Sequence, residues 1–101
     1  MITIKNDKLT VLINEKGAEL QSVQYNGIEY LWQADAKFWA KHSPVLFPIV
    51  GELKNGFYTF NNKEYKLSRH GFARDKVFTA EQTSSASVIF SLRSAADTLL
   101  L

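Results

Sequence analysis

Residues 18–32, with the sequence AELQSVQYNGIEYLW, decide the fold class of this chain. At their centre lies Asn26-Gly27, a pair that favours a two-residue type I′ turn because both central residues of that turn have positive φ. Apolar residues recur on both sides of the pair, up to Tyr25 before it and over residues 28–32 after it. The stretch therefore predicts a tight hairpin of two antiparallel strands.

Short apolar bursts separated by turn-forming residues extend this pattern over most of the chain, and few stretches show a helical period. The further predicted strands are residues 2–4, 9–13, 57–60, 63–67, 77–82 and 86–92, with Asn61-Asn62 and residues 83–85 as the later turns. The pattern is typical of an all-β chain with antiparallel sheets.

Residues 33–56 interrupt this regularity. Residues 34–40 predict a short helical turn, and Pro44 and Pro48 then exclude a central strand or a helix interior. An apolar segment that cannot be regular is expected to shape a pocket wall or to cross the core. For Phe47 itself, structural packing is the expected role.

Composition limits the chain to one domain, residues 1–101, because 101 residues with 46% hydrophobic content support one modest core. There is no cysteine, no phosphate-binding loop, no dinucleotide-binding glycine pattern and no zinc-ligand spacing, so we expect neither cofactor nor metal. The net charge is +2 with scattered lysines, which argues against nucleic acid as a partner. The first residues do not form a signal peptide and no apolar run spans a membrane, so we expect a soluble cytoplasmic protein.

The strongest candidate site is residues 69–75, RHGFARD, in a loop between two predicted hairpins. His70 can donate or accept a hydrogen bond near neutral pH, and Arg74 offers forked donors suited to a diol, a carboxylate or a phosphate. Gly71 would let the backbone turn or approach a ligand closely. The same residues also fit a structural loop in which Arg74 pairs with Asp75.

A second candidate constellation is aromatic and consists of Trp32, Phe38 and Trp39. Sugars present apolar C–H faces that stack on aromatic rings, so aromatics beside a polar loop suit a carbohydrate cleft. Core packing explains the same side chains without a ligand, and for Trp32 it is the preferred interpretation. His42 is interpreted as an ordinary surface residue.

Two stretches resemble a known family: residues 43–56, SPVLFPIVGELKNG, and residues 67–75, LSRHGFARD. Together they are similar to the galactose mutarotase-like superfamily, and most similar to the lactose-operon-associated branch of the aldose 1-epimerase family. Residues 17–20 and 30–33 fit the same template, so the resemblance spans nearly the whole chain. It implies that the chain is the N-terminal part of a large antiparallel β-sandwich.

The resemblance also implies an activity, the interconversion of the α and β anomers of a free aldose such as galactose or glucose. In the family a glutamate acts as general base on the C1 hydroxyl while a histidine protonates the ring oxygen. Both would lie beyond Leu101, so we expect no catalytic residue within this chain. The substrate-binding residues implied here are His70, Arg74, Glu52 and Phe72.

Glu52 departs from the family pattern, because many relatives have a substrate-binding arginine after the residue that corresponds to Gly51. An anion in place of a forked cation argues against a phosphorylated sugar. It also leaves open a second hypothesis, a carbohydrate-binding or sugar-sensing module without catalytic activity. A longer reading frame with the later histidine and glutamate would discriminate the enzyme from the module.

A third hypothesis is a β-rich fragment without a ligand that self-associates through unpaired strand edges. Residues 97–101, DTLLL, end on three leucines, and we interpret this apolar terminus as a truncation. A mass that rises with concentration in light scattering would support self-association.

Overall fold

The computed structural model describes residues 1–100, and Leu101, the last residue of the apolar terminus, lies outside them. Every pair of neighbouring strands in the sheets is antiparallel, which confirms the predicted all-β antiparallel class. The elements in chain order are β1 (Ile2–Lys5), β2 (Leu9–Asn14), β3 (Glu19–Tyr25), β4 (Ile28–Glu29), η1 (Lys54–Gly56), β5 (Phe57–Phe60), β6 (Lys63–Lys66), η2 (Ala73–Asp75), β7 (Thr79–Ser84), β8 (Ser87–Ser91) and η3 (Thr98–Leu100), where η denotes a 3₁₀ helix.

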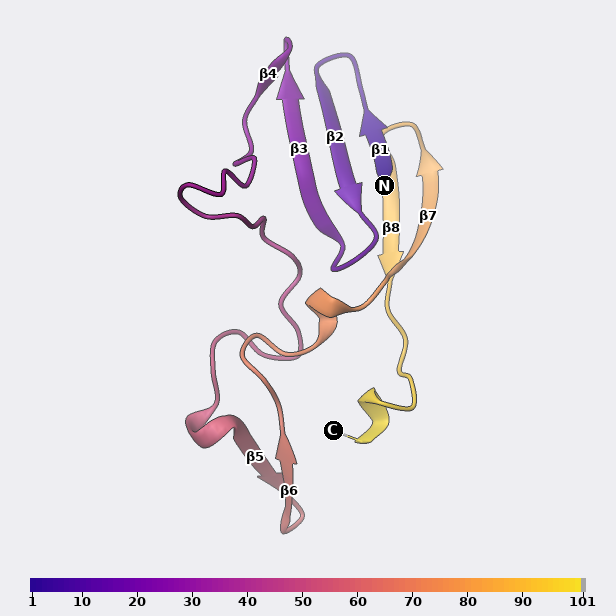
Figure 1. Cartoon of the computed structure of the whole chain (residues 1–101). Helices are drawn as coiled ribbons and strands as arrows, with labels where there is room; N and C mark the ends of the chain where they lie inside the picture. The colour runs from indigo at the N-terminus through magenta and orange to yellow at the C-terminus, as the bar shows by residue number, and fades with distance from the viewer. Residues whose placement is uncertain (101) are drawn as a thin grey trace.

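The strands form a four-stranded sheet in the order β1-β2-β3-β4 and two separate hairpins, β5-β6 and β7-β8 (Figure 1). The β7-β8 hairpin lies beside β1: the Lys5 amide donates to the Ser85 carbonyl at 2.7 Å, and Gln82 Nε2 donates to the Thr3 carbonyl at 2.8 Å. The β5-β6 hairpin lies at the opposite end of the molecule (Figure 1). The segments that join these parts carry the candidate site.

The hairpin predicted at Asn26-Gly27 is confirmed. The two residues have φ of 50° and 72°, as a type I′ turn requires, and Tyr25 pairs with Ile28 across it. The predicted second strand was too long, because β4 ends at Glu29 rather than at residue 32. The Leu31 amide donates to Glu29 Oε2 at 3.0 Å instead of to the neighbouring strand, so the chain leaves the sheet there.

The Glu29 carboxylate accepts hydrogen bonds from three groups. The hydroxyl of Ser22 and the amides of Val23 and Leu31 donate to it and lower its pKa from the ordinary 4.5 to about 2. A carboxylate whose pKa is lower in the folded state stabilises the fold fully above its unfolded pKa and loses that contribution as the pH falls. The relevant window therefore runs from pH 4.5 down to about 2.

We therefore expect Glu29→Gln to lower the urea midpoint of unfolding at pH 7 and to make a smaller difference at pH 2, where the Glu29 carboxyl is about half protonated in the folded state and almost fully protonated in the unfolded state. Urea unfolding of both proteins at the two pH values measures this. Glu64→Gln, at an exposed position of β6, is the matched control and should leave the midpoint near that of the wild type. An equal loss in the Glu29 variant at both pH values would contradict the interpretation.

The two later hairpins are also present. Asn61 and Asn62 have φ of 51° and 61° and close β5-β6 as predicted. The turn of β7-β8 was predicted at residues 83–85 but lies at residues 85–86. Ser84 Oγ accepts from the Ala86 amide at 3.2 Å, so this side chain caps the turn from its last strand position.

Between β4 and η1 the chain is irregular, as the prolines predicted. The helical turn predicted over residues 34–40 is a single turn in which the amides of Phe38 and Trp39 both donate to the Asp35 carbonyl at 3.0 Å. The rest of this segment crosses from the four-stranded sheet to the β5-β6 hairpin (Figure 1). It is held in place by bonds to other segments rather than by a regular ladder.

The buried core is small. Among the described residues, the buried apolar side chains are those of Ile13, Leu67 and Ala73, whereas Phe38 and Val50 are 78% and 76% exposed. The radius of gyration is 16.7 Å, against about 13 Å for a compact chain of this length. Much apolar surface is therefore left uncovered within residues 1–100. No helix within that range is long and apolar enough to cross a membrane.

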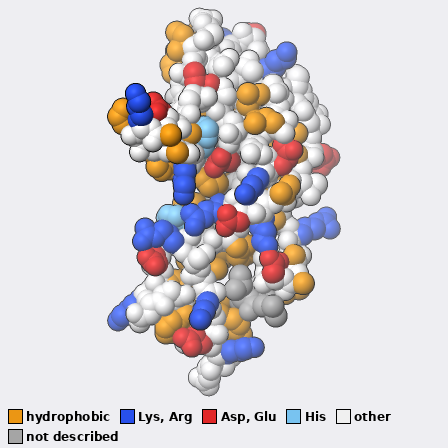
Figure 2. Space-filling model, viewed as in Figure 1, with side chains coloured by type: hydrophobic (Ala, Val, Ile, Leu, Met, Phe, Trp, Pro, Cys, Tyr) orange, Lys and Arg blue, Asp and Glu red, His pale blue; other side chains and the backbone are white. Residues whose placement is uncertain are grey.

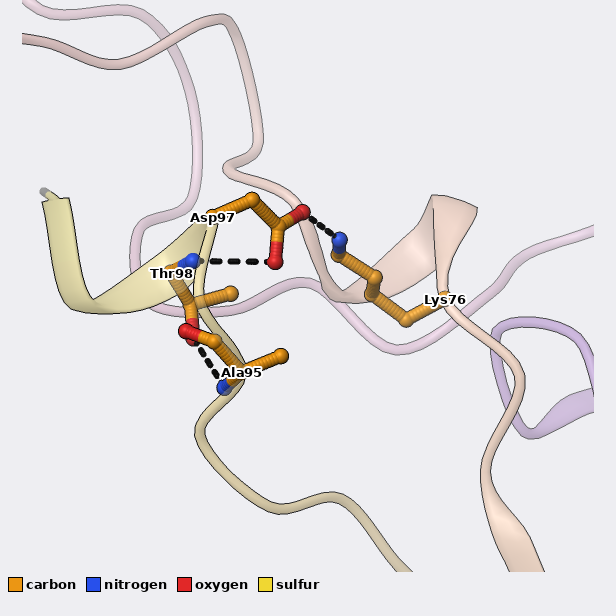
Figure 3. A network of polar contacts seen from close by, with 4 residues as sticks. All are labelled: Lys76, Ala95, Asp97 and Thr98. Carbon is orange, nitrogen blue, oxygen red and sulfur yellow. Dashed lines mark hydrogen bonds and ion pairs between the residues drawn. The ribbon is translucent and has the colours of Figure 1, made fainter.

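The C-terminal segment is tied to the residue that follows η2 (Figure 3). Lys76 Nζ donates to Asp97 Oδ2, and this contact lowers the pKa of the Asp97 carboxyl. The other carboxyl oxygen of Asp97 accepts from the Thr98 amide at 3.0 Å, and Thr98 Oγ1 accepts from the Ala95 amide at 2.8 Å. The segment after β8 thus returns to the loop of residues 69–75.

Candidate functional site

The two motif segments, residues 43–56 and 67–75, are hydrogen-bonded to each other. The Phe47 carbonyl accepts from the amides of Phe72 and Ala73 at 3.0 and 3.1 Å. The His70 amide donates to the Gly51 carbonyl at 2.8 Å, and the Gly51 amide donates back to His70 Nδ1 at 2.8 Å. In a regular sheet such amide and carbonyl groups would be paired with a neighbouring strand, whereas here each motif segment forms these hydrogen bonds with the other segment.

Gly71 makes this contact between the loops feasible. It has a φ of +71°, and a Cβ at this position would lie 2.3 Å from the Phe47 carbonyl oxygen and 2.7 Å from Pro48 Cδ. A side chain is therefore excluded by conformation and by space. The sequence predicted a turn or a close approach to a ligand, and the neighbour that Gly71 approaches is the backbone of the other motif.

His70 is half-buried and held in a defined orientation. Because Nδ1 accepts from the Gly51 amide, the neutral imidazole carries its proton on Nε2. Nε2–H is then a donor that can meet a hydroxyl oxygen. The Gly51 amide therefore determines which hydrogen bond His70 offers to a ligand.

His70 lines an open hollow of about 830 Å³. Three parts of the chain contribute to it: the turn between β2 and β3, the irregular segment, and the loop around η2. The lining residues are Asn14, Lys16, Glu19, Trp39, Ala40, Lys41, His42, Ser43, Pro44, Leu46, Arg69, His70, Arg74 and Asp75. Figure 2 shows basic side chains and histidine gathered across the middle of the molecule, where these segments meet.

The predicted site residues divide into two groups. His70 and Arg74 line the hollow together, whereas Glu52 and Phe72 do not. Phe72 packs edge-on against Phe47 with ring centroids 6.3 Å apart, which agrees with the packing role expected for Phe47 although its side chain stays exposed. Glu52 Oε2 accepts from Arg69 Nη2 at 2.7 Å. The roles of these four residues toward a ligand stay predictions.

The alternative pairing of Arg74 with Asp75 is not observed. Within residues 1–100 the ion pairs are those of the amino terminus with Glu15, Arg69 with Glu52, and Lys76 with Asp97. Arg74 therefore faces the hollow without an ion pair to its neighbour in sequence.

The aromatic constellation is split. Trp39 lines the hollow, while Trp32 and Phe38 pack edge to face with centroids 6.2 Å apart. Trp32 Nε1 donates to the Trp39 carbonyl at 2.6 Å and so ties the two parts together. Packing is thus the observed role of Trp32, and Trp39 is the aromatic residue available to a ligand.

Sequence reasoning did not single out the contribution of the β2-β3 turn, which provides Asn14, Lys16 and Glu19. This turn reaches the site because the Val45 amide donates to the Gly17 carbonyl at 2.9 Å and the Gly17 amide donates to the Lys76 carbonyl at 2.8 Å. These hydrogen bonds join residues far apart in the chain, so no local sequence pattern predicts them.

His42 was interpreted as an ordinary surface residue, and this is wrong. It is half-buried in the lining, and its Nε2 is buried without a hydrogen-bond partner in the part of the chain that the structure describes. Across the same residues, no group of three His, Cys, Asp or Glu side chains could hold a metal ion.

The family model for aldose 1-epimerase matches residues 1–99. A curated relative, the plasmid-encoded protein LacX of Lactococcus lactis subsp. lactis, is 39% identical over 97% of this chain, and the chain covers 35% of that protein. The chain therefore spans about a third of the length of this relative.

Two solved structures have the same fold. A galactose mutarotase-related enzyme from Lactobacillus acidophilus is 44% identical with a TM-score of 0.91, over 98% of this chain and 34% of its own. A galactose mutarotase-like protein from Lactobacillus casei is 42% identical with a TM-score of 0.92, over 99% of this chain and 35% of its own. The chain thus belongs to the aldose 1-epimerase family.

Proposed function

We propose that this chain, residues 1–101, is the N-terminal part of a sugar mutarotase and supplies part of its sugar-binding side. One observation carries the proposal: His70, oriented by the Gly51 amide, lines the same hollow as Arg74. An imidazole donor beside a guanidinium suits the hydroxyl groups of a sugar. Trp39 in the same lining offers a ring on which an apolar sugar face can stack.

The substrate in this proposal is a free aldose such as galactose or glucose. His70 Nε2–H donates to a ring hydroxyl, and Arg74 binds neighbouring hydroxyls. Phe72 packs on Phe47 outside the lining and stabilises the loop. These contacts fix the sugar relative to groups supplied by the rest of the protein. The protein would act in cytoplasmic carbohydrate metabolism.

The chemistry itself belongs to residues beyond Leu101. A glutamate there removes the proton of the C1 hydroxyl and a histidine protonates the ring oxygen, so the bond between C1 and the ring oxygen breaks. After rotation about the C1–C2 bond, the ring oxygen attacks the other face of C1, and the reverse proton transfers complete the closure of the ring. One C–O bond breaks and re-forms with no net change in oxidation state, so the reaction requires no redox cofactor.

Polarimetry of freshly dissolved α-galactose and α-glucose tests this proposal. The rotation is followed with this chain and, separately, with the full-length product of the gene. We expect only the longer product to accelerate mutarotation, because this chain lacks the acid and the base. Acceleration by this chain alone would contradict the placement of the catalytic groups.

A second candidate function is a carbohydrate-binding or sugar-sensing module without catalysis. The observation that favours it is Glu52, an exposed anion at the edge of the site, paired with Arg69. If neither product accelerates mutarotation and a galactose titration still shifts the His70 resonances in NMR, this function replaces the enzymatic one.

A further inference from the structure

Arg69 and Glu52 form an exposed ion pair at the edge of the hollow. Arg69 Nη2 lies 2.7 Å from Glu52 Oε2, and the two side chains are 63% and 56% exposed. Ion pairs this exposed contribute little to stability. The main effect of the pair is therefore on the position of the Arg69 guanidinium group and not on the stability of the fold.

The position of the pair is set by the backbone. Glu52 follows Gly51 directly, and Arg69 precedes His70 directly, so the pair flanks the two hydrogen bonds that join Gly51 and His70. Arg69 and His70 are thus neighbours in the chain that both line the hollow. The position of the Arg69 guanidinium group depends on the same junction that orients His70.

The two partners face the hollow differently. Arg69 belongs to its lining with His70 and Arg74, and Glu52 does not. Glu52 occupies one edge of the guanidinium group and leaves further N–H donors of its planar fork for other acceptors. A planar fork in the same lining as the His70 donor suits two neighbouring hydroxyl groups of a sugar ring.

We propose that Arg69 is a sugar-binding residue that contacts a vicinal diol of the sugar, and that Glu52 is a positioning residue that acts through Arg69. This inference rests on the proposed function, because it requires that the hollow binds a free aldose. It assigns to Glu52 a role without direct contact with the substrate.

Isothermal titration of the full-length product with D-galactose and with D-glucose tests the proposal. We expect Arg69→Gln to weaken binding about 10-fold or more, the range for hydrogen bonds to a charged group. Arg69→Lys keeps a cation for Glu52 but removes the fork, so it should bind nearly as weakly as Arg69→Gln. Glu52→Gln should weaken binding by roughly two- to fivefold, in line with the small energy of an exposed pair.

Glu52→Asp should regain part of the affinity lost in Glu52→Gln, because it restores the anion that holds Arg69. Arg93→Gln removes an exposed arginine outside the lining and should bind like the wild type. The urea midpoints of all these variants should stay within error of the wild type, since the positions are exposed. Full affinity in Arg69→Lys would overturn the diol contact.

The failure of this inference is distinguishable from that of the proposed function. If the wild type binds galactose or glucose, His70→Asn weakens binding and Arg69→Gln does not, the role of Arg69 is overturned and the sugar site stands. If the wild type binds neither sugar, the proposed function is overturned, and the role of Arg69 with it.

Discussion

Replacing Gly71 with alanine is expected to lower the free energy of unfolding by about 2–4 kcal/mol, from left-handed backbone strain plus a forced backbone shift. The new Cβ would lie 2.3 Å from the Phe47 carbonyl oxygen, and that atom belongs to the backbone, so it cannot rotate away. Because the Phe47 carbonyl accepts from Phe72 and Ala73, any shift also breaks the bonds between the two motif loops.

Gly27→Ala is the matched control. Gly27 has a φ of +72° and Gly71 a φ of +71°, but a Cβ on Gly27 meets no atom within 4 Å. The backbone strain is therefore the same, and Gly27→Ala should cost about 1 kcal/mol. Urea unfolding of both variants measures the difference, and equal losses would show that the close approach to Phe47 has no energetic weight.

The second large effect is expected at His70. His70→Ala removes the acceptor for the Gly51 amide and the Nε2–H donor together. We expect galactose affinity to fall roughly 30-fold or more and stability to fall by about 1–3 kcal/mol, because the Gly51 amide loses its partner.

His70→Asn separates these two contributions. The asparagine Oδ1 can take the place of Nδ1 and accept from the Gly51 amide, and asparagine tolerates the φ of +63° at this position. We expect near-wild-type stability and roughly 10-fold weaker binding, because the loop is kept and one donor to the sugar is lost. Titration of the full-length product with galactose, followed by urea unfolding, measures both. Wild-type affinity in His70→Asn would show that Nε2–H does not contact the sugar.

Local turn chemistry predicted much of the fold. Asn26-Gly27 and Asn61-Asn62 close hairpins with the positive φ values that those residues tolerate. Pro44 and Pro48 likewise predicted the irregular crossing, since neither can donate to a ladder. Each of these outcomes depends on the conformation of two or three adjacent residues, which the residue types restrict directly.

Strand ends were predicted less well. β4 stops at Glu29 because this side chain accepts from the amides of Val23 and Leu31, and the last turn moves to residues 85–86 because Ser84 caps it. In both places a side chain competes with the ladder for backbone donors. Apolar periodicity carries no information on such a competition.

The site shows the same division. By itself the sequence determined the all-β class, the hairpin turns, the family resemblance and the choice of His70 and Arg74 as candidates. Only the tertiary structure decided that the Gly51 amide orients His70, that Arg74 faces the hollow, and that Glu52 pairs with Arg69 outside its lining. The physical reason is range: turns follow from backbone preferences within a few residues, whereas the hollow depends on hydrogen bonds between residues as distant as Gly17 and Lys76.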